Sequence, residues 1–179
     1  QGVFPATAFG AIPRSGFVNT AGLTVRGLDL TGSYRRPAFG GDLTLSGNAS
    51  WLLDYERATT PTSPYQEIVG RVGFPAKFRS RVSTDWNRGA FGGGIAWNHV
   101  SGSHDNLGAR LDSQNTFDLQ ARWRGPERGW AKGVVATLSV RNVFDAAPPF
   151  YDNPLGFGFD ATNADVIGRF VSLQLTRSW

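Results

Sequence analysis

The segment that decides the fold lies at the end of the chain and reads Gly168-Arg-Phe-Val-Ser-Leu-Gln-Leu-Thr-Arg-Ser-Trp179. Within it Val171, Leu173, Leu175 and Trp179 share one parity, whereas serine, glutamine and threonine side chains occupy the other. Successive side chains of a β-strand point to opposite faces of a sheet. The alternation therefore predicts a strand with one apolar face and one polar face.

The same alternation recurs along the whole chain, and helical periodicity is almost absent. Leu138 and Val140, for example, alternate with Ser139 and Arg141. The sequence therefore predicts an all-β chain in which about seven sequential antiparallel strands form an open, curved sheet, with the first and last strands as unpaired edges. The predicted strands span residues 22–35, 42–56, 76–87, 90–101, 114–124, 133–145 and 168–179.

The connections between these strands alternate in length. Short ones are predicted near residues 36–41, 88–89 and 125–132, and long ones near 57–75, 102–113 and 146–167. Short turns on one rim and long loops on the other are typical of outer-membrane barrels, in which the long loops face outward. The pattern therefore favours a segment of a transmembrane β-barrel.

Large aromatic residues on the apolar parity lie near the strand ends, as in the interfacial girdles of such barrels. A soluble β-sandwich, such as a carbohydrate-binding module, also alternates apolar and polar residues and is the main alternative fold. However, its aromatics should cluster in mid-strand, and its strands should be shorter. The girdle residues are Tyr34, Trp86, Phe91, Trp123 and Trp179 toward the short turns, and Tyr55, Phe78, Trp97, Phe117 and Phe144 toward the long loops.

Composition excludes several functional classes. The formal net charge is +4 and the pI is near 10.0, but the basic residues are scattered singly, so we expect no nucleic-acid partner. The absence of cysteine excludes a disulfide framework, a thiol nucleophile and a cysteine-ligated zinc site. No apolar run approaches the roughly 20 residues that a transmembrane helix needs.

Four stretches in the last part of the chain stand out as motifs: Leu138-Ser-Val-Arg-Asn-Val-Phe-Asp145, Pro148-Pro-Phe-Tyr-Asp-Asn153, Asn163-Ala-Asp165 and Gly168–Trp179. These stretches resemble the C-terminal β-barrel of TonB-dependent outer-membrane receptors. The resemblance covers about residues 17–179 and is strongest in the last part of the chain. Val143 stands where the family commonly has Leu, Asp29 stands where it has Glu, and the terminal residue is Trp179, where Phe is commoner.

The resemblance implies a transporter for active nutrient uptake across the outer membrane of a Gram-negative bacterium, and not an enzyme. Such receptors have barrels of about 22 strands, so residues 1–179 are expected to be a fragment that lacks the TonB box, the plug domain and the earlier strands. The implied partners are outer-membrane lipid, the barrel assembly machinery, the plug and remaining strands of the parent chain, and, through that chain, the TonB complex. No cofactor is expected. A ferric siderophore, cobalamin, a metal chelate and an oligosaccharide all remain possible substrates.

The resemblance and the alternation together nominate three groups of residues. The assembly machinery is expected to read the last strand through Val171, Leu173, Leu175 and Trp179. The charged candidates for the barrel lumen are Asp29, Asp54, Arg79, Arg81, Asp85, Asp118, Arg122 and Arg141. The aromatic candidates in the extracellular loops are Tyr65, Phe150, Tyr151 and Phe157.

Other motifs are better explained by structure than by chemistry. Asn142 and Asp145 are expected to organise the exit from a strand, because Asn and Asp side chains bond nearby backbone. His99 and His104 are too few for a metal site, which usually needs more ligands, and are expected to be solvated loop residues. The glycines of 92–94 lack the Gly-Lys-Ser/Thr ending of a phosphate loop, so they predict tight curvature or a close approach in the lumen.

Two other functions remain open beside the soluble sandwich. A passive porin-type channel would need no plug and should lack the motifs of residues 138–145 and 148–153. An outer-membrane phospholipase would need a Ser-His arrangement on the apolar wall. Ser101 and Ser103 lie near the histidines, but no further signal supports a catalytic triad.

Overall fold

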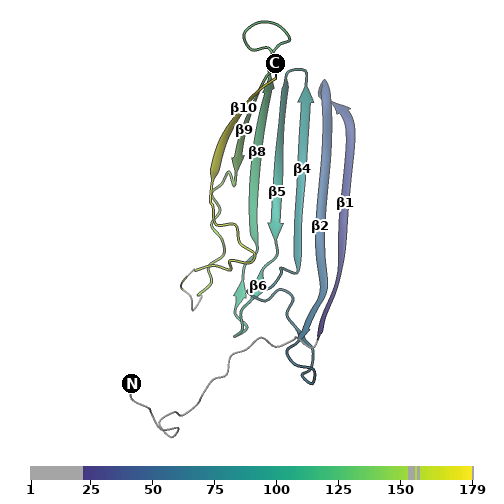
Figure 1. Cartoon of the computed structure of the whole chain (residues 1–179), viewed down its shortest axis with the longest axis vertical. Coiled ribbons are helices and arrows are strands. Elements are labelled where there is room, and N and C mark those ends of the chain that lie inside the picture. The colour runs from purple at the N-terminus through teal and green to yellow at the C-terminus, as the bar shows by residue number, and fades with distance from the viewer. Residues whose placement is uncertain (1–21, 153–155, 157, 179) are drawn as a thin grey trace, which may run out of the picture.

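The long strands of the protein lie side by side in one antiparallel sheet (Figure 1). This computed structural model describes residues 22–152, 156 and 158–178. The order across the sheet is β1-β2-β4-β5-β8-β9-β10, with the two-residue β3 beside β2 as the remaining member of an 8-stranded sheet. The strands are β1 (Gly22–Ala38), β2 (Gly41–Ala58), β3 (Gln66–Glu67), β4 (Phe78–Arg88), β5 (Phe91–Val100), β8 (Gln114–Arg124), β9 (Val134–Arg141) and β10 (Phe170–Arg177).

The predicted all-β architecture is therefore confirmed. Long strands follow one another across the sheet in chain order, and each pairs antiparallel with the next. Among the described residues, β1 pairs only with β2 and β10 only with β9, so the sheet stays open at both edges, as predicted. No helix in the described part of the chain is long and apolar enough to cross a membrane.

Most strand boundaries differ from the prediction by one or two residues, and the ends of two strands differ by more for local reasons. β1 continues to Ala38, so a two-residue turn of Phe39 and Gly40 joins it to β2. β9 ends at Arg141, not at residue 145, because Asn142 adopts a left-handed backbone with φ 48°. Asn tolerates this conformation better than most residues do, and it ends the extended strand there.

The long loops contain short paired segments that the alternation could not predict. β6 (Ser103–His104) and β7 (Arg110–Leu111) form a small separate hairpin, and β3 extends one end of the main sheet. His104 also forms a parallel bridge with Arg71, which joins two successive long loops. Elements of two residues have no measurable period, so sequence alternation cannot reveal them.

The described residues form no dry core. No large side chain among them is fully buried, and the buried apolar residues are mostly alanines. Meanwhile Leu30 is 73% exposed and Leu175 is 68% exposed. A β-sandwich would bury such side chains between two sheets, so the single sheet contradicts the sandwich alternative.

Candidate functional site

The register of the strands separates the side chains into two faces of opposite character. Across three neighbouring strands Arg81 lies opposite Asn98, and Asn98 lies opposite Thr116. On the other face Val82 lies opposite Trp97, and Trp97 lies opposite Phe117. We call these the polar face and the apolar face. Seven of the eight charged residues nominated from the sequence as lumen candidates lie on the polar face: Asp29, Arg79, Arg81, Asp85, Asp118, Arg122 and Arg141. Asp54 does not lie with them, because a β-bulge shifts the register between Arg26 and Gly27 and places Asp54 opposite Arg26, on the face of Leu28, where the two side chains form an ion pair at 2.6 Å.

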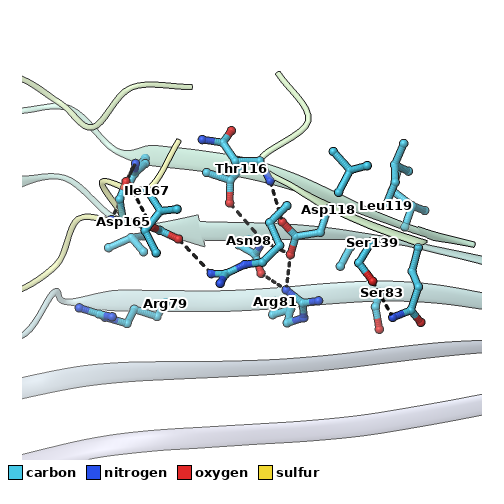
Figure 2. A pocket seen from close by; sticks show the side chains of 18 of the residues that line it. Arg79, Arg81, Ser83, Asn98, Thr116, Asp118, Leu119, Ser139, Asp165 and Ile167 are labelled. Carbon is cyan, nitrogen blue, oxygen red and sulfur yellow. Dashed lines mark hydrogen bonds and ion pairs between the residues drawn. The ribbon is translucent and has the colours of Figure 1, made fainter. Parts of the chain in front are cut away.

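The polar face contains a pocket of about 970 Å³ (Figure 2). Side chains from β4, β5, β8 and β9 form its floor, and residues 162–167 of the last long loop form one wall. The loop therefore folds back over the polar face instead of extending away from the sheet. The lining mixes basic, acidic and amide side chains with a few aliphatic ones.

Two ion pairs compensate four of the six charges that line this pocket: Arg81 with Asp118 inside the sheet, and Arg141 with Asp165 of the last long loop. Arg81 donates to Asp118 at 2.8 Å, although the two residues stand on strands separated by β5. Asn98 lies between them and donates to the same carboxylate at 3.0 Å (Figure 2). Charge-assisted hydrogen bonds of this kind are stronger than neutral ones and fix the geometry of the group. The cluster thus stabilises three adjacent strands.

Two residues of the last long loop attach it to the loop before β4. Asp160 is buried and accepts a hydrogen bond from the backbone N–H of Gly73 at 3.3 Å. Asn163 accepts from the N–H of Ala76 at 3.0 Å and donates to the carbonyl of Phe74 at 2.7 Å. These contacts join segments 87 residues apart in the chain. The position of the loop is therefore set by specific hydrogen bonds.

The same loop is also bound to the floor of the pocket. Arg141 forms an ion pair with Asp165 at 3.1 Å, and the Gln114 side chain bonds both the N–H and the carbonyl of Asp165 at 3.1 Å (Figure 2 shows the Asp165 carboxylate). Arg79 donates to Asn163. The alternation in the sequence nominated the two arginines as lumen candidates, and the family resemblance included the stretch Asn163-Ala-Asp165, but neither predicted that these residues pair with one another.

Asn142 and Asp145 build the turn that leaves β9. The Asn142 side chain is buried and exchanges two hydrogen bonds with the backbone of Ala146, each 2.9 Å long. Asp145 accepts from the N–H of Arg169 at 2.8 Å, which ties the two ends of the long loop together. The N–H of Asn142 donates to Asp118 at 3.1 Å. The motif thus has the structural role expected of it.

Gly92 and Gly94 leave space for polar side chains of neighbouring strands. A Cβ atom at Gly92 would lie 2.5 Å from the side-chain oxygen of Asn87, and one at Gly94 would lie 2.5 Å from a carboxylate oxygen of Asp85. The close approach predicted for these glycines therefore comes from β4, within the sheet itself.

The histidines do not form a metal site, and one of them corrects the sequence interpretation. His99 is not a solvated loop residue, because it lies half-buried on the apolar face of β5. Its ring bonds the Asn115 side chain at 2.9 Å and contacts the rings of Phe78 and Trp97. Within the described residues no group of histidine and carboxylate side chains could hold a metal ion.

The remaining nominated residues do not gather at one place. Val171, Leu173 and Leu175 lie exposed on the apolar face of the edge strand β10. Tyr65 lies against Gly22 at the opposite edge of the sheet. The loop after β9 holds Phe150, which is exposed, and Tyr151, which is half-buried. Trp179 and Phe157 lie outside the described residues.

Comparison with known proteins agrees with this geometry. The family model described as TonB dependent receptor-like, beta-barrel, matches residues 2–143. The match covers β1 to β9, including the part of the chain where the sequence resemblance is diffuse. No curated protein and no solved structure matches the chain. Because the family model covers most of the sequence, the chain belongs to the TonB-dependent receptor-like β-barrel family.

Proposed function

We propose that this chain is the C-terminal part of the barrel wall of a TonB-dependent outer-membrane transporter that actively imports a scarce nutrient. The family is one of outer-membrane transport proteins and receptors, not of enzymes. The observation that carries the proposal is the single sheet with one compensated polar face, one exposed apolar face and no core between two layers. Such a sheet is stable only when lipid covers the apolar face and its edges are paired.

The direction of the edge strands supports a place within a larger barrel. Every strand on the path from β1 to β10 runs antiparallel to its neighbour, so β1 and β10 themselves run in the same direction. They cannot pair antiparallel with each other. An antiparallel barrel that includes this sheet needs an odd number of further strands between them. A barrel of about 22 strands meets this condition.

The polar face suits contact with a plug better than recognition of a charged nutrient. Arg81 and Arg141 are already paired with Asp118 and Asp165. A site for an anionic nutrient would instead present uncompensated cations toward the pocket. We therefore assign the polar face to the water-filled interior, where it contacts the plug of the parent chain. The TonB complex would act through that plug.

Uptake by whole cells tests the proposal. A strain that lacks the full-length gene should lose accumulation of one labelled nutrient class among a ferric siderophore, cobalamin, a nickel chelate and an oligosaccharide. The wild-type gene should restore it only while TonB is present. Restored accumulation in cells without TonB would instead support a passive channel. A full-length protein that fractionates away from the outer membrane would refute both.

A further inference from the structure

The end of the sheet with the short turns carries an unbalanced positive charge. We define the short-turn rim as residues 35–43, 86–92, 122–135 and 176–178, where β1 joins β2, β4 joins β5 and β8 joins β9. Its acidic side chains are Asp42 and Glu127. Its cationic side chains are Arg35, Arg36, Arg88, Arg122, Arg124, Arg128, Lys132 and Arg177.

Most of these cations are free to bind something outside the protein. Asp42 is already paired with Arg35 at 2.9 Å, so it balances no other charge. By contrast, the following rim side chains are exposed and form no hydrogen bond or ion pair with the described part of the chain: Arg36, Arg88, Arg124, Arg128 and Lys132.

The rim at the other end of the sheet, which the long loops form, carries no such excess of positive charge. Arg169 there is paired with Asp145, and Arg57 stacks over the Phe74 ring at 5.3 Å. The basic residues of the long loops stand among many carboxylates. Those carboxylates are Glu56, Glu67, Asp105, Asp112, Asp145, Asp152, Asp160 and Asp165. The charge of the chain is thus polarised along the strand direction.

Exposed aromatic side chains accompany the cations of the short-turn rim. Trp130, in the connection that projects beyond the sheet between β8 and β9, is 85% exposed (Figure 1). Phe39 is 83% exposed in the turn after β1, where it adopts φ 53°. A bulky residue in this conformation is strained and persists only where the surroundings enforce it. Both turns therefore present a large aromatic ring to the surroundings.

The turn that carries Trp130 is well defined at its base. Gly125 donates to the carbonyl of Val134 at 2.7 Å, and Val134 donates to that of Ala131 at 3.1 Å. Ala131 is 3% exposed and fills the interior of the turn. The outward position of Trp130 thus follows from the backbone of the turn.

The cations and the aromatics occupy successive levels along the strands. On the apolar face Arg36 follows Tyr34 by two residues, and Arg88 follows Trp86 by two residues. Tyr and Trp rings settle at the headgroup level of a bilayer. The arginines beyond them then reach the phosphates, with their aliphatic stems against the apolar wall.

We propose that the short-turn rim binds the headgroups of anionic glycerophospholipids in the membrane leaflet that it faces. The inference rests on the proposed function, which places the sheet in a bilayer. Arg124 lies on the polar face, but the other four free cations are spread along the rim beside exposed aromatics and line no single cavity, so a lipid surface fits them better than an acidic protein does. Each basic residue near the surface of an anionic membrane raises the affinity of the protein for that membrane by about fivefold.

Lipid selection by the full-length protein tests this inference. The protein would be reconstituted into nanodiscs of phosphatidylcholine containing a minor fraction of phosphatidylglycerol, and the enrichment of phosphatidylglycerol around it measured by native mass spectrometry. The variant Arg128→Gln/Lys132→Gln should lower the enrichment by about fivefold or more. Trp130→Ala should lower it less. The matched control Arg71→Gln/Arg110→Gln removes two cations from the long-loop rim and should leave it unchanged.

The outcomes separate this inference from the proposed function. Equal enrichment of phosphatidylglycerol around the two double variants would overturn the lipid assignment. The assignment would also be overturned if the short-turn rim bound soluble polyglutamate and phosphatidylglycerol could not displace it, because the rim would then prefer an acidic protein. Raising the salt from 0.1 to 1 M shortens the Debye length from about 10 to about 3 Å, so enrichment should fall for the wild type. A protein that inserts and restores uptake but selects no lipid contradicts only this inference. Failure to insert into any bilayer contradicts the proposed function instead.

Discussion

Arg81 on β4 and Asp118 on β8 form a 2.8 Å ion pair across the intervening strand β5. The carboxylate of Asp118 also accepts the backbone N–H of Asn142 at 3.1 Å, at the point where β9 ends. One side chain thus links three strands to the turn that starts the last long loop. The Asp118 side chain is only 19% exposed, so water cannot easily take the place of these hydrogen bonds when they are lost.

Removing the Asp118 carboxylate should therefore destabilise the sheet. Asp118→Ala leaves Arg81 without its ion pair and the N–H of Asn142 without an acceptor, which costs about 1–3 kcal/mol for each poorly solvated group. Asp118→Asn should cost less, because the amide oxygen still accepts from Asn142. Urea unfolding of the full-length protein in lipid vesicles measures both changes. The control Asp29→Ala removes an exposed carboxylate of the same face and should have little effect. An equal loss for Asp118→Ala and Asp29→Ala would contradict this account.

Asn163 should hold the last long loop against the loop before β4. Asn163→Ala removes the bonds to the N–H of Ala76 and the carbonyl of Phe74. We expect amide hydrogen exchange at Ala76 to become faster by tenfold or more, since the two lost hydrogen bonds contribute about 1 kcal/mol each and the loop opens more often without them. Asp152→Ala, an exposed residue of the same loop, is the matched control. Unchanged exchange at Ala76 would mean that other contacts hold the loop.

Much of this architecture could be predicted from the sequence because a strand with two different faces leaves a strict period of two. Leu138 and Ser139 illustrate the strength of the signal, since a shift of one residue would exchange their faces. Asn142 could also have been recognised as a strand end, because Asn tolerates left-handed backbone and the motif contains another such residue in Asp145. The prediction instead followed the apolar parity as far as Phe144 and made the strand too long.

The wall of the pocket could not be predicted in the same way. Asp160 and Asn163 act on partners 87 residues away, and no local pattern connects such distant segments. His99 was misassigned for a related reason. The sequence shows it at a strand end near serines and glycines, but its environment is created by Asn115, Phe78 and Trp97 from three strands.

The chain expressed by itself should require detergent. Leu28, Leu30 and Leu173 illustrate an apolar face that stays exposed, at 61%, 73% and 66%. Both edges of the sheet also offer unpaired backbone groups to other chains. We expect aggregates in plain buffer, as measured by size-exclusion chromatography and light scattering. A monodisperse monomer without detergent would contradict the assignment of the apolar face to lipid.

Deletion of Trp179 should impair assembly more than transport. The family resemblance implies that the assembly machinery reads the last strand, including its terminal aromatic and the apolar side chains of Val171, Leu173 and Leu175. The amount of the truncated full-length protein in isolated outer membranes should therefore fall, while uptake per assembled molecule stays close to normal. Quantitative immunoblotting beside an uptake assay measures both. Normal abundance with lost uptake would instead place Trp179 in the transport path.

Leu138 and Ser139 should respond in opposite ways to the same introduced charge. Leu138 lies on the apolar face between Ala121 and Leu173, whereas Ser139 lies on the polar face and accepts from Gln120 at 3.3 Å. Both residues occupy the middle of β9, where the apolar face would meet the centre of the bilayer. Leu138→Arg should cost about 2–4 kcal/mol, because hydrocarbon offers the guanidinium no partner. Ser139→Arg should cost far less, because the polar face already accommodates Arg141 and Arg122.

Folding of the two full-length variants into vesicles, followed by urea titration, measures this difference. Because the variants carry the same new side chain at adjacent positions of one strand, intrinsic strand propensity and net charge are matched between them. The difference in stability between the two variants therefore reports the environment of each face of the sheet. Equal stability would mean that lipid does not cover the apolar face, and a larger loss for Ser139→Arg would mean that the polar face is the one removed from water in the full-length protein. Either result would overturn the membrane orientation proposed for this sheet, whereas selective loss in Leu138→Arg would establish which face the bilayer covers.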